Sequence, residues 1–445
     1  MKNKTMMRVS FAVLMLIVLV ALPLAGCKPA AEPTTPSAEK PPITVKISLG
    51  TQLTGPYAST TIPITYGHID FVRHLNEDLD GFVVDGQRYY IDLMWADDKM
   101  DMAVALANFQ KWAEEGSVCH MQQGTPLAMA IAESQSPKYE IPGFGGGWSA
   151  WTPTDWGWTI ITPYDEGFAA LIRWASEEHW KEERPARVGF LVWDTAFGKN
   201  AVRDELFDYY KENLNMEIVD VEYFPMTSVD YSTYLANLKK ADVDYICCNA
   251  LVSSTAPLAK EAERLGMTPA NGVNWLLTYW HSGGPMISLA GESAVEGWMT
   301  MSQYPEMTSV DNPNCPGAVE MLDCVSKWRP DYERAAKFDL NYVLGWTTSK
   351  YMVAAVKKTI ERVGWPITGK DVQETLSAGI TIPMGGLVPT CYFSKDEHIS
   401  YHGIQVHKVQ DGEWVKVTEW MPTPLVGPGT VEWRYDVKTD KETKF

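Results

Sequence analysis

Basic side chains are scarce in this sequence of 445 residues. Lys and Arg together number 38 against 56 Asp and Glu, and the formal net charge is -18. Three of the basic residues, Lys2, Lys4 and Arg8, lie in the first 27 residues, which contain no acid, so the remainder is more acidic still. An acidic body of this kind argues against an extended surface for nucleic acid or anionic lipid.

Motifs of common catalytic and phosphate-binding sites are also missing. There is no G-x-S-x-G nucleophile turn and no P-loop. The run GFGGGW at 143–148 does not fit a dinucleotide loop, because Trp148 takes the place of the third glycine. The eight His residues are scattered, and we expect a structural role for His402 and His407, which lie five residues apart. We therefore expect no enzyme, no metal and no cofactor.

Apolar runs long enough to span a bilayer are lacking as well. The run from Phe11 to Leu22 is too short, and it follows a basic start, which is typical of a signal peptide. It ends in Leu24-Ala25-Gly26-Cys27, the pattern of a bacterial lipobox, so we expect cleavage before Cys27 and its lipidation. Residues 1–26 would be the signal peptide, and 27–42, rich in Pro, Ala and Thr, a flexible tether.

Cysteines are few, and none has the spacing of a zinc site. An exported protein can form disulfides, and Cys315 and Cys324, nine residues apart, are the leading candidate pair. Cys247 and Cys248 lie in an apolar strand and are expected to be buried thiols. The other two are Cys119 and Cys391.

What the chain does contain is a repeated alternation of strands and helices. Residues 43–49 alternate apolar and polar side chains, which predicts a strand, and Gly55-Pro56 then predicts a turn before a helix. Further strands are predicted at 88–95, 118–121, 139–144, 187–193, 217–223, 244–249, 274–278 and 295–301. Helices are predicted from that turn to about residue 80 and at 102–115, 126–135, 199–214, 230–240, 255–265 and 341–363. Asp98 is the predicted N-cap of the helix at 102–115. Such alternation favours doubly wound parallel sheets, and the length allows two or three domains.

Six stretches, in chain order, resemble type I periplasmic substrate-binding proteins of the branched-chain amino acid (Leu/Ile/Val-binding-like) ABC transporter family. They are LTGPYAS from Leu53, QQGTPLA from Gln122, IPGF from Ile141, VWDTAFG from Val192, SLAGESAVEG from Ser288 and HKVQDG from His407. The resemblance covers about Ile43 to Trp420, and with the lipobox it indicates the lipoprotein form of the family.

The resemblance implies two Rossmann-like lobes that close on a small ligand like a Venus flytrap. Crossovers are expected near Thr162, Met301 and Phe393. Lobe 1 would comprise 43–162 plus 301–392, and lobe 2 would comprise 163–300 plus 393–445. The closed form of such a protein, usually a monomer, docks on a permease in the inner membrane.

The resemblance also implies a ligand site, and here the sequence departs from amino-acid binders. In lobe 1, hydroxyls and backbone amides that could hold a carboxylate come from the loops after two strands, although Thr125 could equally be a helix N-cap. In lobe 2, Phe197 and Leu251 match positions that are usually Tyr, and the region expected to carry the acid for an ammonium group, 275–281, has none. The expected site residues are Tyr57, Gln123, Gly124, Thr125, Gly147, Trp148, Ser149, Phe197, Leu251, Tyr279 and Trp280.

A buried ammonium group without a counter-charge is costly, so the sequence favours an apolar or aromatic ligand, with a carboxylate as its polar group. Several of the 18 Trp residues lie where the cleft is expected, and aromatic walls suit such a ligand. Two alternatives remain open: a branched-chain or other amino acid or amide binding protein of the same family, and a ligand-sensing receptor of the same fold.

Overall fold

The computed structural model describes residues 40–146, 154–282, 284–304, 315–332, 339–427, 430–433 and 437. Cys27, Gly147, Trp148 and Ser149 lie outside the described residues, as do the predicted signal peptide and most of the tether. The chain from Pro42 onward forms one compact unit. None of the described helices is long and apolar enough to cross a membrane.

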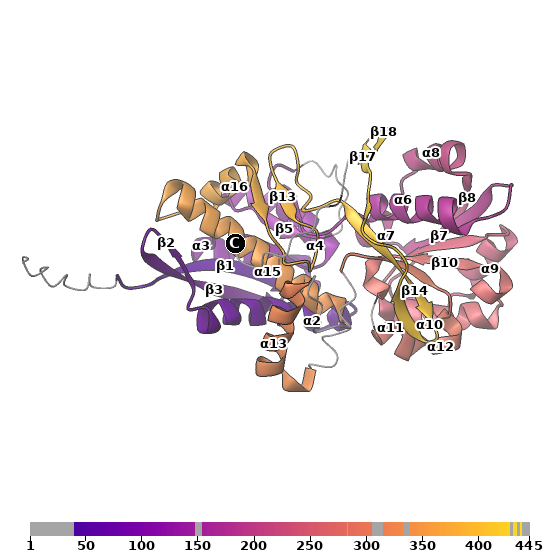
Figure 1. Cartoon of the computed structure of the whole chain (residues 1–445), viewed down its shortest axis with the longest axis horizontal. Helices are drawn as coiled ribbons and strands as arrows, with labels where there is room; N and C mark the ends of the chain where they lie inside the picture. Colours follow the sequence, from indigo (N-terminus) through magenta and orange to yellow (C-terminus); the bar gives the residue numbers. More distant parts are fainter. Residues whose placement is uncertain are drawn as a thin grey trace, which may run out of the picture. The chain divides into compact units, whose positions relative to one another are not determined.

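The first sheet has six strands in the order β2-β3-β1-β4-β5-β6 (Figure 1). Its strands are β1 (Ile43–Thr51), β2 (Phe82–Val84), β3 (Gln87–Asp97), β4 (His120–Gln122), β5 (Gly143–Gly145) and β6 (Gly157–Thr159). All neighbours are parallel except the hairpin of β2 and β3. Every residue of β1 from Ile47 to Thr51 is buried, as expected of an interior strand that is covered on both faces.

The second sheet runs in the order β15-β14-β11-β10-β9-β7-β8, and β16 pairs with β14. Its strands are β7 (Ala186–Trp193), β8 (Met216–Phe224), β9 (Tyr245–Asn249), β10 (Asn274–Leu277), β11 (Met299–Ser302), β14 (Gly403–Gln410), β15 (Glu413–Lys416) and β16 (Met421–Pro422). The strands from β8 to β11 are parallel, whereas β14 joins β11 antiparallel. Two doubly wound α/β sheets are therefore present, as predicted.

Helices connect the strands of both sheets (Figure 1). With the first sheet lie α2 (Ala58–Arg73), its π-helical extension η2 (His74–Asp78), α3 (Met102–Glu114), α4 (Thr125–Ala130), η3 (Ile131–Gln135), α5 (Ser136–Tyr139), α13 (Pro316–Trp328), α15 (Leu340–Val363) and α16 (Gly369–Ala378). With the second lie α6 (Tyr164–Trp174), η4 (Ala175–His179), α7 (Ala196–Lys199), α8 (Glu205–Leu214), α9 (Ser232–Lys240), α10 (Val252–Arg264), α11 (Gly284–Ala290) and α12 (Glu292–Val295). A short hairpin of β12 (Ile380–Ile382) and β13 (Cys391–Phe393) precedes β14.

Several predicted details were wrong. Asp101, not Asp98, caps α3 by accepting from the backbone N–H groups of Ala103 and Val104, because Asp98 is committed to buried side-chain amides instead. The helix predicted at 199–214 starts only at Glu205, as α8, and the short α7 ends at Lys199. The strand predicted at 139–144 starts only at Gly143, and the one at 295–301 starts only at Met299.

The candidate disulfide between Cys315 and Cys324 is not formed, because both are free thiols. Cys315 is the N-cap of α13 and Cys324 lies inside that helix. Nine residues along a helix rise by about 13 Å, whereas bridged Cα atoms lie within about 7 Å of each other. Cys247 and Cys248 are buried thiols in β9, as predicted.

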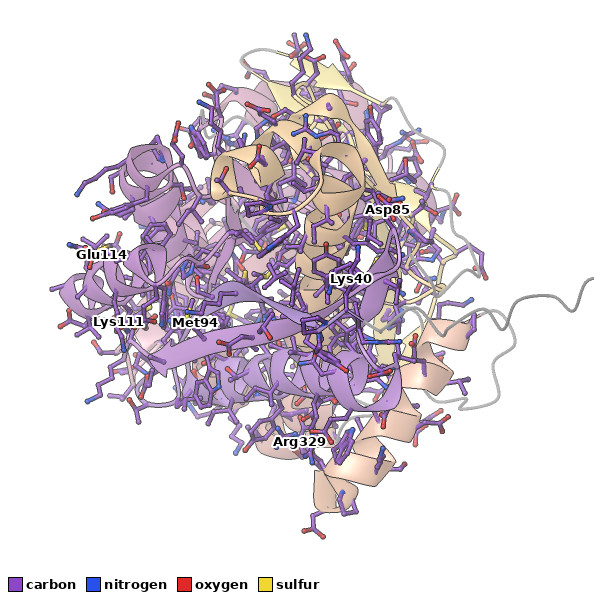
Figure 2. The ribbon with its side chains drawn as sticks, turned by 90° about the vertical axis from the view of Figure 1, so that its left-hand side faces the viewer. Lys40, Asp85, Met94, Lys111, Glu114 and Arg329 are labelled. Atoms are coloured by element: carbon purple, nitrogen blue, oxygen red, sulfur yellow. The ribbon has the colours of Figure 1, made fainter. Side chains whose placement is uncertain are left out.

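Helices α2 and α15 approach each other at two glycines. A Cβ atom on Gly345 would lie 1.8 Å from the carbonyl oxygen of Ile64, and one on Gly67 would lie 2.1 Å from that of Tyr342. Helix α13 is also fixed to α2, because Arg329, beside α2 in Figure 2, places its Nε 2.5 Å from Oδ2 of the buried Asp70. These contacts form the framework beneath the site described below.

Three connections pass between the two sheets: β6 to α6, β11 to α13, and β13 to β14. They are hydrogen-bonded to one another. Thr162 Oγ1 lies 3.0 Å from Gly403 O, Gln303 Nε2 lies 3.2 Å from Thr162 O, and Tyr401 OH lies 3.1 Å from Gln303 Oε1. The three connections between the sheets are therefore in contact with one another around Thr162, Gln303 and Gly403.

Next to these connections, His402 is held between two carboxylates. Its Nδ1 lies 3.0 Å from Glu166 and its Nε2 lies 3.1 Å from Glu397. Burial alone would lower the pKa of His402, but the two carboxylates raise it to about 10. His402 is therefore positively charged at neutral pH and joins α6 to the segment before β14.

Candidate functional site

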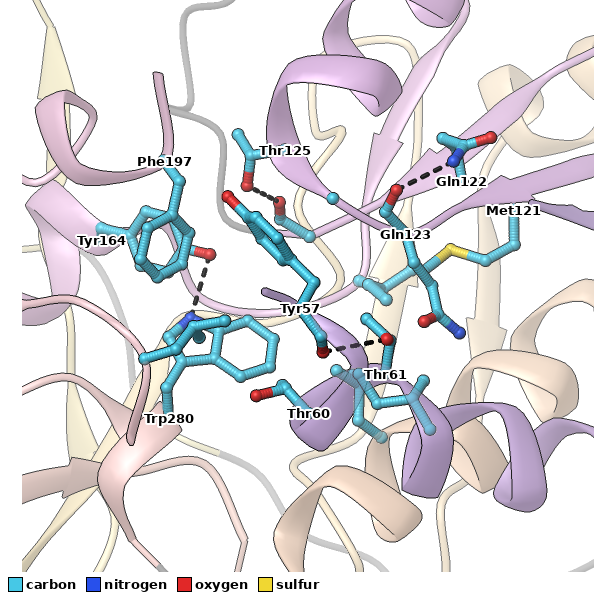
Figure 3. Close-up of a pocket in the computed structure, with 16 residues that line it drawn as sticks. Tyr57, Thr60, Thr61, Met121, Gln122, Gln123, Thr125, Tyr164, Phe197 and Trp280 are labelled. Carbon is cyan, nitrogen blue, oxygen red and sulfur yellow. Dashed lines mark hydrogen bonds between the residues drawn. The ribbon is translucent and has the colours of Figure 1, made fainter. Parts of the chain in front are cut away.

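A small cavity lies where the carboxyl ends of the two sheets face each other (Figure 3). The space open to the centre of a water molecule measures about 40 Å³. The cavity is lined by Tyr57, Thr60, Thr61, Ile64, Met121, Gln122, Gln123, Gly124, Thr125, Gly146, Ile160, Tyr164, Phe197, Leu251, Trp280 and Leu344. Half of these residues lie within about four residues after the end of a parallel strand, at the sheet edge where ligands bind in such folds.

Tyr57 reaches from the first sheet's side into the aromatic residues of the second. It is the N-cap residue of α2, and its ring meets Trp193 and Phe197 edge to face at centroid distances of 5.8 and 6.4 Å. The Tyr57 hydroxyl is buried and has no hydrogen-bond partner among the described residues. Burial, with a smaller contribution from Tyr164, raises the pKa of Tyr57, so its hydroxyl is a proton donor at any physiological pH.

The loop after β4 supplies polar groups on the same side. Gln123 Oε1 accepts from Thr51 Oγ1 at 3.1 Å, which fixes the amide. Gly124 is the N-cap of α4 and has φ of 81°, a conformation that favours glycine. Thr125 is thus inside α4 and is not its N-cap, so that alternative was wrong; its hydroxyl lies 3.4 Å from Gly146 O.

The second sheet contributes mainly rings and an aliphatic side chain. Phe197 lies in α7 after β7, Leu251 precedes α10 after β9, and Trp280 lies in the short helix η6 (Tyr279–His281) after β10. Trp280 Nε1 donates to the hydroxyl of Tyr164 at 3.1 Å (Figure 3). Burial raises the pKa of Tyr164 to about 12, so this hydroxyl also stays protonated. The wall on this side is apolar apart from the Tyr164 hydroxyl.

The cavity is electrically neutral, since no Asp, Glu, Lys, Arg or His is among the described residues that line it. The carboxylate of Asp98 lies behind it, where it accepts from Gln52 Nε2 at 2.8 Å and from Gln122 Nε2 at 2.7 Å. Burial raises the pKa of Asp98. Both amides are therefore occupied by this buried acid. Thr61 and Thr125 donate to backbone carbonyl groups, so the hydroxyl of Tyr57 is left to meet a ligand.

Seven of the predicted site residues line this one cavity: Tyr57, Gln123, Gly124, Thr125, Phe197, Leu251 and Trp280. Tyr279 does not; its ring stacks on Tyr164 at 5.6 Å from behind. The prediction missed Tyr164, whose place directly after the first crossover was a usable indication. It also missed Thr60, Thr61 and Ile64, which share one face of the helix that Tyr57 begins.

Two mainly parallel α/β sheets joined by three connections, with a cavity between their carboxyl ends, define a two-lobed binding protein. A family model described as Periplasmic binding protein matches residues 44–413. The chain belongs to this family, a family of solute-binding proteins, and the resemblance predicted from the sequence is confirmed. A search of curated proteins finds no match.

Solved structures agree on the fold. A branched-chain amino acid ABC transporter protein from Thermus thermophilus with bound valine has a TM-score of 0.72 at 21% identity, covering 86% of this chain and 97% of its own. A fatty acid ABC transporter substrate-binding protein from Thermomonospora curvata has a TM-score of 0.72 at 19% identity, covering 86% of this chain and 93% of its own. A solute binding protein from R. palustris in complex with 4-hydroxybenzoate has a TM-score of 0.69 at 14% identity, covering 85% of this chain and 97% of its own. The type I periplasmic binding protein fold is thus confirmed.

Proposed function

We propose that this chain is the solute-binding receptor of an ABC importer and closes on a small apolar or aromatic carboxylate. The observation that carries the proposal is the cavity: it is neutral, walled by rings and aliphatic side chains, and has a buried Tyr57 hydroxyl with no partner among the described residues. Such a site combines an apolar body with a few polar groups that fix orientation, as small-molecule sites do.

The neutral lining argues against an α-amino acid. An ammonium group enclosed by these residues would have no described carboxylate beside it, and removing an unpaired charge from water costs several kcal/mol. A ligand carboxylate has a neutral partner here in the Tyr57 hydroxyl, which is buried and has no partner among the described residues. The valine bound by the Thermus relative marks the alternative that an amino acid or amide is the ligand.

The size of the cavity implies movement. The space open to water centres, about 40 Å³, is far smaller than the hundreds of Å³ in a typical small-molecule pocket. A ligand must therefore part Tyr57 from Trp193 and Phe197. We propose that this happens by rotation about the three connections near Thr162, Gln303 and Gly403, with lobes bounded as the sequence predicts.

A thermal-shift panel on the chain from Pro42 tests the ligand class. Benzoate, 4-hydroxybenzoate and short aliphatic carboxylates are expected to raise the melting temperature, because ligand that binds only the folded chain stabilises it by mass action. Their amides are expected to act more weakly, and leucine and valine not at all. Strong stabilisation by leucine alone would overturn the apolar-ligand proposal.

Tyr57→Phe is the matched variant for this panel. It keeps the ring contacts but removes the hydroxyl, so carboxylate affinity should fall about tenfold or more, the equivalent of one lost hydrogen bond to a charged group. Stability without ligand should be unchanged or slightly higher. Tyr66→Phe, on the same helix but outside the cavity, is the control; equal loss in both variants would show that the Tyr57 hydroxyl does not contact ligand.

We further propose that Cys27 carries the lipid anchor of an exported, monomeric receptor that delivers its ligand to an inner-membrane permease. The family is extracytoplasmic, and the lipobox ending in Cys27 supports the anchor. Incorporation of labelled fatty acid into the full chain should disappear in Cys27→Ala, which should also leave the membrane fraction. Retention of the label would show that Cys27 is not the acylated residue.

A further inference from the structure

Four side chains of metal-binding types converge where α2 and its extension η2 meet α13, away from the cavity. His74 and Asp78 are four residues apart at the end of the first helix, and Glu320 and Cys324 are four residues apart on the second. Residues at this spacing share one helix face, so each helix presents a pair to the other. His74 and Cys324 are buried, and Asp78 and Glu320 are partly exposed, which leaves the cluster open to solvent.

The atoms of this cluster are already close together. His74 Nδ1 lies 2.9 Å from Asp78 Oδ2, and His74 Nε2 lies 3.2 Å from Glu320 Oε1. One ligand atom each from His74, Asp78 and Cys324 can be chosen so that all lie within 4.8 Å of one another. Around a tetrahedral zinc ion, neighbouring ligand atoms are roughly 3.5 Å apart, so small side-chain rotations bring these three into range.

We propose that His74, Asp78 and Cys324 form a zinc-binding site, completed by water, in which Glu320 orients the imidazole. Nitrogen, thiolate sulfur and carboxylate oxygen are the three donor types that Zn²⁺ accepts, and a mixed set with an open position suits it better than Ca²⁺ or Mg²⁺. A carboxylate on the second nitrogen of a ligating histidine is the usual way to fix its ring. Such an ion would link α2, which begins beside Tyr57, to α13.

Without metal the same residues form an ion-pair network, because Lys327 pairs with Asp78. Burial would lower the pKa of His74, but hydrogen bonds to Cys324, Glu320 and Asp78 raise it to about 10. Burial raises the pKa of the Cys324 thiol. Zinc must displace Lys327 from Asp78. Because the thiolate and the neutral imidazole are the forms that bind metal, binding should also release protons and strengthen as pH rises.

Titration of the metal-free chain from Pro42 with Co²⁺ tests the site, with Zn²⁺ as competitor. The wild type should develop the thiolate-to-cobalt charge-transfer absorption and the visible bands of tetrahedral Co²⁺, both removed by Zn²⁺. Cys324→Ser should abolish the thiolate band, and His74→Gln should weaken Zn²⁺ binding at least about 100-fold. Glu320→Gln should weaken it about tenfold, the smaller loss expected of a residue that acts through another.

Cys315→Ser is the matched control, since Cys315 begins the same helix but lies outside the cluster. Calorimetry in two buffers of different protonation enthalpy should also record proton release on Zn²⁺ binding. Absence of the thiolate band in the wild type, or its persistence in Cys324→Ser, would overturn the proposal. Circular dichroism confirms that each variant is folded. The result does not depend on the ligand cavity, so either proposal can fail alone.

Discussion

Gly345→Ala is expected to lower the free energy of unfolding by about 3 kcal/mol or more, at the upper end of what overpacking costs. The new methyl group would lie 1.8 Å from the carbonyl oxygen of Ile64, and backbone of a packed helix cannot move aside as a side chain can. Helices α2 and α15 must separate along their contact, which also disturbs the packing of buried Ile64 and Leu344. Because a folded domain is stable by only about 5–15 kcal/mol, this loss is large.

Urea unfolding followed by fluorescence measures the effect, and Gly167→Ala in α6 is its control. There the added methyl would meet the thioether of Met301, which can rotate, and alanine gains helix propensity, so a loss of about 1 kcal/mol is expected. The double variant Gly345→Ala with Gly67→Ala should lose less free energy of unfolding than the sum of the two single losses, because the first change has already separated the helices. Equal stability of Gly345→Ala and wild type would mean that the two helices pack less closely than described.

Leu251→Asp is expected to weaken binding of benzoate at pH 7 at least about 100-fold relative to Leu251→Asn. Leu251 is 1% exposed and lines the neutral cavity, so a carboxylate there would be enclosed without a described cation and beside the ligand's own charge. Leu251 is also the N-cap of α10. Asp and Asn cap helices equally well, so the comparison isolates the charge.

Calorimetric titration of both variants with benzoate over a range of pH is the measurement. Below the range in which carboxylates ionise, the two affinities should converge, because a protonated aspartic acid is as neutral as asparagine. If Leu251→Asp gains binding of leucine, this would also support the proposal, because the new carboxylate would balance the charge of the leucine ammonium group. Equal affinities at pH 7 would show that the cavity stays open to water when ligand is bound.

The fold was predictable because short stretches of the sequence indicate the individual strands, turns and helices. Apolar alternation in β1 and the apolar run of β7 identified strands, and Gly55-Pro56 marked the turn between the first strand and helix. Where prediction failed, competing residues decided the outcome. Asp98 and Asp101 both precede α3, and only tertiary contacts with Gln52 and Gln122 show which of them is free to cap it.

The cavity lining was predictable where the chain resembles the family in loops that come after strands, as at Gln123, Phe197 and Leu251. It was not predictable where packing decides: Leu344 reaches the cavity from α15, far along the chain, and no local pattern indicates this. The same limit applies to the cluster at His74, whose partner Glu320 is 246 residues away. Such groupings become visible only when α13 is placed against α2.

The pairing of β11 with β14 has a consequence for how the chain folds. Thr300 pairs with His407, so the edge of β11 stays uncovered until a strand about a hundred residues further along has been made and returned to it. An uncovered strand edge is a template for pairing with other chains, and such distant pairing is slow. During synthesis and refolding, the second sheet therefore remains open to aggregation longest, and truncation before β14 should yield insoluble chain.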